Sequence, residues 1–97
     1  MAQEQRTQAG IETWQAYYSA LLAQEGAERL RRVKSRLYEK LESINEEIES
    51  LEEDRERIFG RQPEIVTFIE REVESLITTG REASIRLETV IGLLGEE

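Results

Sequence analysis

The chain has 97 residues, the length of one domain, and only 38% of them are apolar. We therefore do not expect one copy of the chain to form a large hydrophobic core by itself. It contains no histidine and no cysteine, which excludes disulfides, the usual zinc, haem, copper and iron–sulfur sites, and Ser-His or Cys-His nucleophile pairs. A net charge of −8 opposes general binding to nucleic acids and anionic membranes.

Residues 1–8 are polar, and we expect them to be frayed. They lack the apolar stretch of a signal peptide, and no run approaches the ~20 apolar residues that span a bilayer. The sequence therefore predicts a soluble, cytoplasmic protein that does not contact membranes.

A helical repeat of apolar residues begins at Ile11 and continues in phase through Gly26 to Leu30. Glycine inside a helix costs roughly 1 kcal/mol relative to alanine, which does not by itself end a helix. We therefore favour one continuous first helix over residues 9–59, with a break at residues 25–27 as the alternative.

Two long apolar stripes follow, with residues spaced alternately by four and three positions. The first stripe consists of Leu37, Leu41, Ile44, Ile48, Leu51, Arg55 and Ile58. The second consists of Val66, Ile69, Val73, Leu76, Gly80, Ala83, Leu87, Val90 and Leu94. This spacing is typical of helices that pack lengthwise. Gly60 favours a left-handed helix end and Pro63 a first helical turn, so we predict a turn over residues 60–63 and a second helix over residues 63–94.

The predicted fold is all-α, a single helical domain over residues 1–97. We expect an antiparallel coiled-coil helical hairpin with an N-terminal helical extension. If the first helix is continuous, its aromatic N-terminal third extends beyond the hairpin, and another chain must bury it. If the helix breaks near Gly26, this third can fold back as a third helix of a short bundle.

The second predicted helix carries apolar residues on both its stripe and the neighbouring positions. Outside the stripe lie Ile65, Phe68, Ile77, Ile91 and Leu93. A band this wide indicates three or four packed helices. We therefore expect a homodimer or higher homo-oligomer that forms a multi-helix bundle, or a complex with another protein.

Seven apolar or aromatic residues form the predicted partner or oligomer interface. They are Trp14, Tyr17, Tyr18, Leu21, Leu22, Ile77 and Ile91. Aromatic side chains are favoured in the buried centres of interfaces, which supports this interpretation of the aromatic cluster. Burial in the chain's own core is the alternative.

The charges of the first helix are segregated along its length. A basic patch comprises Arg29, Arg31, Arg32, Lys34, Arg36 and Lys40, which together with Glu39 give a local charge of +5. Residues 42–56 have a local charge of −7, and we define the acidic patch as Glu46, Glu49, Glu52, Glu53 and Glu56. Three interpretations stay open: solvated helix faces, charges that orient two antiparallel copies, or a dock for phosphate or an acidic protein.

The sequence therefore predicts no catalytic residue, no cofactor and no metal ligand. We expect a non-catalytic, oligomeric structural or adaptor protein that acts through protein–protein contacts. One alternative is an acidic inhibitor or regulator that masks a basic partner surface. A further alternative is nucleic-acid binding through residues 29–40, which the net charge opposes.

Overall fold

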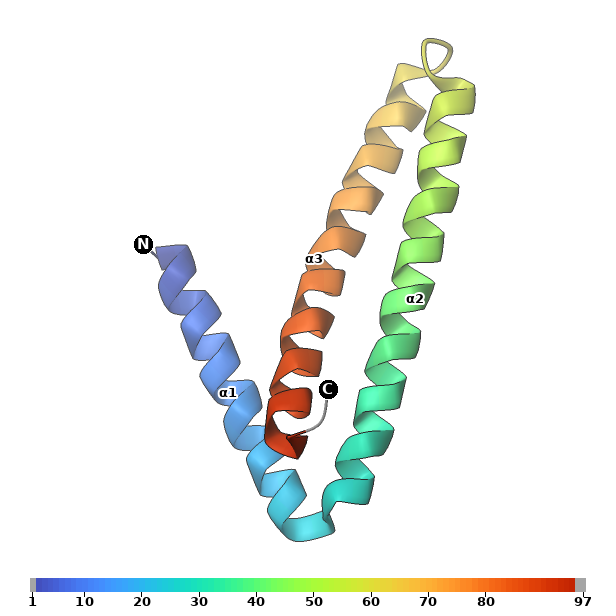
Figure 1. The fold of residues 1–97 in the computed structure, drawn as a ribbon. Helices are drawn as coiled ribbons and strands as arrows, with labels where there is room; N and C mark the ends of the chain where they lie inside the picture. The colour runs from blue at the N-terminus through green and yellow to red at the C-terminus, as the bar shows by residue number, and fades with distance from the viewer. Residues whose placement is uncertain (1, 96–97) are drawn as a thin grey trace.

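The structure is a computed structural model that describes the backbone of residues 2–95 and the side chains of residues 13–95. The described chain is all-helical, which confirms the all-α part of the predicted fold. Helix α1 spans Ala2–Glu25, α2 spans Ala27–Ile58 and α3 spans Pro63–Leu94. Figure 1 shows α2 and α3 side by side and running in opposite directions, while α1 leans against one end of the pair.

We call the end of the α2–α3 pair near Gly26 the corner end, and the end near Gly60 the turn end. Helix α1 contacts both other helices near the corner end, and its N-terminal half diverges from α3 (Figure 1). Among the described residues, none of the helices combines the length and apolar character that crossing a membrane requires.

The favoured prediction of one helix over residues 9–59 is wrong, and the chain breaks at Gly26. This glycine has φ +87° and ψ 174°, a backbone conformation that is essentially restricted to glycine. Its N–H still donates to the Leu22 carbonyl oxygen at 2.9 Å. The helix also begins at Ala2, earlier than the expected start at residue 9.

Burial explains the break, because the corner returns α1 onto the other two helices. Each large side chain that is removed from water stabilises the fold by about 2 kcal/mol. A continuous helix would add only one helical residue, Gly26, and glycine is a poor helix former. The burial of Tyr18 alone offsets that difference.

The connection between α2 and α3 is a tight turn at residues 58–61. Phe59 has φ −57° and ψ 129°, and Gly60 has φ +82°, which are values typical of a type II turn. The Arg61 N–H donates to the Ile58 carbonyl oxygen at 3.0 Å and closes the turn. Pro63 then occupies the first turn of α3, where its missing N–H costs no helical hydrogen bond.

The hydrophobic core lies at the corner end, where three helices meet. Its buried residues are Tyr18, Leu30, Leu37, Ala83, Leu87 and Val90. Toward the turn end only two helices remain, and the buried residues there are Ile44, Val66 and Ile69. Two helices cannot surround their shared side chains, so stripe residues such as Ile48 and Leu76 stay partly exposed.

Candidate functional site

An aromatic cluster holds α1 against α3. The Tyr18 side chain is 1% exposed, and its ring stacks on Trp14 with centroids 5.7 Å apart. Tyr17 packs edge-on against both rings, at 6.0 Å and 5.1 Å. Arg86 Nε donates a 2.9 Å hydrogen bond to the Tyr18 hydroxyl, and its guanidinium lies 4.3 Å from the Trp14 ring centroid. These contacts place Arg86 between α1 and the rest of the molecule.

The chain buries Tyr18 in its own core, which is the alternative that the sequence left open for this residue. Four other predicted interface residues, Trp14, Leu21, Leu22 and Ile91, are partly buried against the same core. The aromatic third therefore folds back as a third helix, which is the arrangement predicted for a helix that breaks near Gly26, and the overhang predicted for a continuous helix does not form. Of the seven predicted interface residues, Tyr17 and Ile77 are exposed, at 55% and 39%.

The basic patch divides into two groups around α2. Arg29, Arg36 and Lys40 line one groove of about 260 Å³ together with Arg86 of α3 and the two tyrosines of α1. We call it the basic groove. The other members of the patch, Arg31, Arg32 and Lys34, do not line this groove.

Arg86 is the groove residue that the sequence did not identify. It lies in the wide apolar band of α3, and a lone cation within such a band is the signal that could have marked it. Its partners Trp14 and Tyr18 come from a distant part of the chain. The sequence pattern therefore cannot show what Arg86 contacts, because these contacts form only when the corner places α1 against α3.

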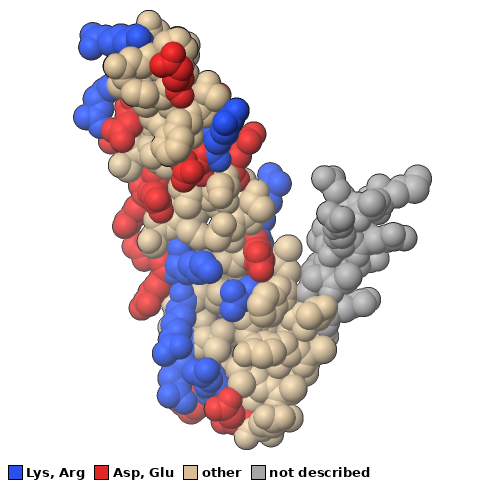
Figure 2. Space-filling model, turned by 180° about the vertical axis from the view of Figure 1, so that it is seen from behind, with Lys and Arg blue, Asp and Glu red and all other residues tan. Residues whose placement is uncertain are grey.

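Charge is unevenly distributed over the surface. On the face shown in Figure 2, Lys and Arg side chains gather over the corner half of the molecule, and Asp and Glu side chains lie mostly farther toward the turn end. All members of the acidic patch are exposed. Within the described part of the chain, no group of acidic side chains is arranged to hold a metal ion.

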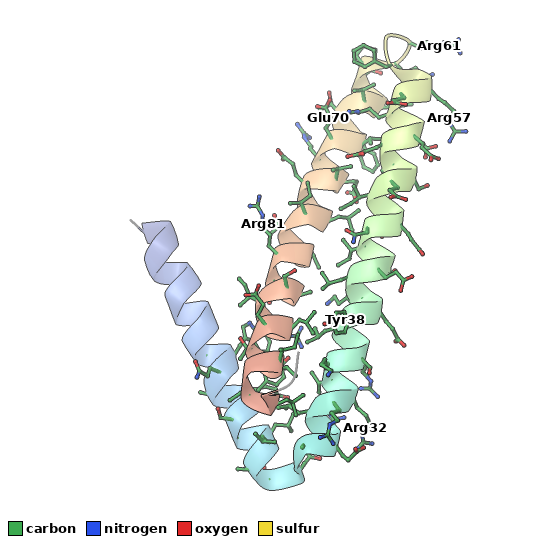
Figure 3. The ribbon with its side chains drawn as sticks, in the orientation of Figure 1. Arg32, Tyr38, Arg57, Arg61, Glu70 and Arg81 are labelled. Atoms are coloured by element: carbon green, nitrogen blue, oxygen red, sulfur yellow. The ribbon has the colours of Figure 1, made fainter. Side chains whose placement is uncertain are left out.

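The turn end carries charged side chains as well as exposed aromatic side chains. Arg57 and Arg61 lie there, as Figure 3 shows, and Arg57 pairs with Asp54 on the same helix. Across the two helices, Arg55 Nη1 lies 4.0 Å from Glu70 Oε1. Both pairs are substantially exposed, and such pairs contribute at most about 1 kcal/mol.

A second groove, which we call the apolar groove, runs between α2 and α3 without any contribution from α1. Its volume is about 540 Å³. Its apolar wall consists of Leu41, Ile44, Ile48, Leu76, Ile77 and Ile85. Asn45, Gly80, Arg81 and Ser84 complete the lining, so the groove has one cation and no carboxylate among the described residues.

No residue lines both grooves. A helix turns by about 100° per residue, so the exposed residues Lys40 and Asn45 point about 140° apart, whereas the buried residues Leu37 and Ile44 point in nearly the same direction. The two grooves are therefore lined by different side chains, although their buried residues share one face of α2.

Comparison of the chain with protein-family models, curated proteins and solved structures found no match.

Proposed function

We propose that this chain is a non-catalytic structural or adaptor protein that functions as a homodimer through protein–protein contacts. The observation that carries the proposal is the open apolar groove between α2 and α3. Helix α1 covers the corner end of the pair only, so the six aliphatic residues of the groove, apart from the buried Ile44, remain partly in contact with water. Such a surface is favoured at an interface, because burying each large side chain contributes about 2 kcal/mol.

A second copy of the chain is the occupant that the charges favour. The basic patch and the acidic patch follow one another along α2, and Leu41 and Ile44 of the apolar groove lie at the transition between them. Two copies that cross antiparallel at this point place each basic patch beside the acidic patch of the other copy. A parallel arrangement would place like charges together, so the charges select the antiparallel orientation.

Pairing through the apolar groove gives four helices around one shared core, which is the arrangement of a four-helix bundle. In the dimer, each α2–α3 pair acts as an antiparallel coiled-coil hairpin. The shared core closes the side of the hairpin that α1 does not cover. The exposed turn ends then point in opposite directions, where they can contact another protein.

Analytical ultracentrifugation of Ile77→Asp tests this function. Ile77 lines the apolar groove and is 39% exposed, so the monomer tolerates the aspartate, whereas a dimer must bury its charge. We expect the wild type to sediment as a dimer and the variant to dissociate at least about tenfold more readily.

Phe59→Asp is the matched control, because Phe59 is 73% exposed at the turn and does not line the groove. It introduces the same charge and should leave the dimer intact. A wild-type chain that is monomeric at every concentration would contradict the proposal. Equal dissociation of the two variants would also contradict it, because the apolar groove would then not be the interface.

A further inference from the structure

The basic groove brings four cationic side chains together between α1, α2 and α3. Arg29 and Arg36 lie two turns apart on α2, Lys40 lies one turn further on, and Arg86 comes from α3. Within the described chain, no carboxylate lines this groove. The acidic neighbour of the cluster is Glu25, whose Oε2 lies 3.9 Å from Arg29 Nε. One carboxylate cannot balance four cations, so the groove has a positive local field.

Of the three guanidinium groups in the groove, that of Arg86 is fixed in place before any ligand arrives, and that of Arg29 has an unsatisfied donor. Arg86 is held by the Tyr18 hydroxyl and by the Trp14 ring. Arg29 Nε is inaccessible to solvent and has no hydrogen-bond partner among the described residues, because Glu25 is too distant to accept one. A donor that is removed from water without an acceptor is costly, and an anion in the groove would lower that cost.

We propose that the basic groove binds a small ligand with two or more adjacent phosphate groups. Guanidinium groups match phosphate oxygens with paired, charge-assisted hydrogen bonds, and four cations exceed the charge of a single phosphate. The volume of about 260 Å³ suits a diphosphate and leaves Tyr17 as an exposed aromatic wall. No residue of the apolar groove lines this site, and a single copy of the chain supplies all of its cations.

The charge of the neighbouring surface restricts the ligand to a small one. The acidic patch begins at Glu46, less than two helical turns beyond Lys40. An extended nucleic acid that followed α2 would meet these carboxylates, whereas a ligand confined to the groove would not. The groove therefore favours a compact polyanion over a polymer.

Pyrophosphate titration of the full chain at low salt, followed by calorimetry and by tryptophan fluorescence, tests the proposal. Trp14 is the single tryptophan, and its contact with Arg86 makes its emission sensitive to an anion in the groove. We expect saturable binding of pyrophosphate, weaker binding of inorganic phosphate and a change in Trp14 emission. A nucleoside diphosphate that binds more tightly than pyrophosphate would identify a nucleotide as the ligand, and equal or weaker binding would identify a free diphosphate.

The decisive variant is Arg36→Gln with Lys40→Gln, two exposed residues whose replacement leaves the core intact. We expect its affinity for pyrophosphate to fall roughly tenfold or more for each cation removed. The matched control is Arg32→Gln with Arg71→Gln, which removes the same charge from exposed positions outside the groove. The control should bind pyrophosphate almost as the wild type does.

Three results would overturn the proposal. One is the absence of a binding signal with millimolar pyrophosphate, and another is an equal loss of affinity in both double variants. The third is duplex DNA that binds more tightly than pyrophosphate and displaces it. Circular dichroism of each variant separates a lost site from a lost fold.

Discussion

Arg86 connects α1 to α3 through a hydrogen bond to the Tyr18 hydroxyl and through the face of the Trp14 ring. Its guanidinium is the polar partner that allows a tyrosine to be buried in a small core. The residue therefore contributes to the stability of the corner as well as to the charge of the basic groove.

Removing the hydroxyl tests this role. We expect Tyr18→Phe to lower the free energy of unfolding by about 1.5 kcal/mol, because the charge-assisted hydrogen bond from Arg86 is lost. Urea denaturation measures the change. Tyr17→Phe is the control, since Tyr17 is mostly exposed and should change the free energy of unfolding by less than about 0.5 kcal/mol. Equal effects would show that the Arg86 bond does not stabilise the corner.

Residue spacing predicted much of the burial but not the polar contacts. Leu37, Ile44 and Leu87 are stripe positions, and all three are buried. The Arg86–Tyr18 bond joins residues 68 positions apart, and it forms only because α1 turns back. Heptad spacing describes neighbours along one helix, so it contains no information on such a contact.

At the scale of helices, Gly26 determines where α1 lies. The residues around it favour a helix, and local propensity therefore predicted one continuous element. The positive φ of +87° is the conformation that lets the chain reverse direction there. Sequence alone could not decide between the two forms, because they differ by the burial of side chains distant in sequence rather than by local preference.

Gly26→Ala should therefore shift the balance toward the continuous helix. Alanine gains roughly 1 kcal/mol of helical propensity and disfavours the corner by roughly 1–3 kcal/mol. We expect α1 to separate from α3, so that Trp14 emission shifts to the red and the radius of gyration measured by X-ray scattering increases.

Gly92→Ala is the control for this substitution. Gly92 lies within α3 without a positive φ, and an added Cβ there meets open space. We expect it to stabilise the protein by up to about 1 kcal/mol without moving Trp14. If both variants keep the shape and emission of the wild type, Gly26 does not control the position of α1.

At the scale of the whole molecule, the described chain is elongated, with a longest extent of 55 Å. Three helices enclose a core at the corner end, and two helices leave the apolar groove open. The apolar band of α3 predicted that additional helices cover it, and α1 supplies one of them. The width of the band could not reveal how many of the covering helices belong to this chain. A third helix of the same chain and a helix of a second copy would bury the same apolar side chains of α3.

The distance between the two turn ends of the proposed dimer tests its central feature. The chain has no cysteine, so Arg61→Cys provides a single site for a spin label at the exposed turn. If two copies cross antiparallel between Leu41 and Ile44, each turn end lies about 28 Å from the crossing point, at 1.5 Å per residue. We expect pulsed electron paramagnetic resonance to give a label separation of about 55 Å. Adjacent labels, as in a parallel dimer, or the absence of any intermolecular distance would contradict antiparallel pairing through the apolar groove.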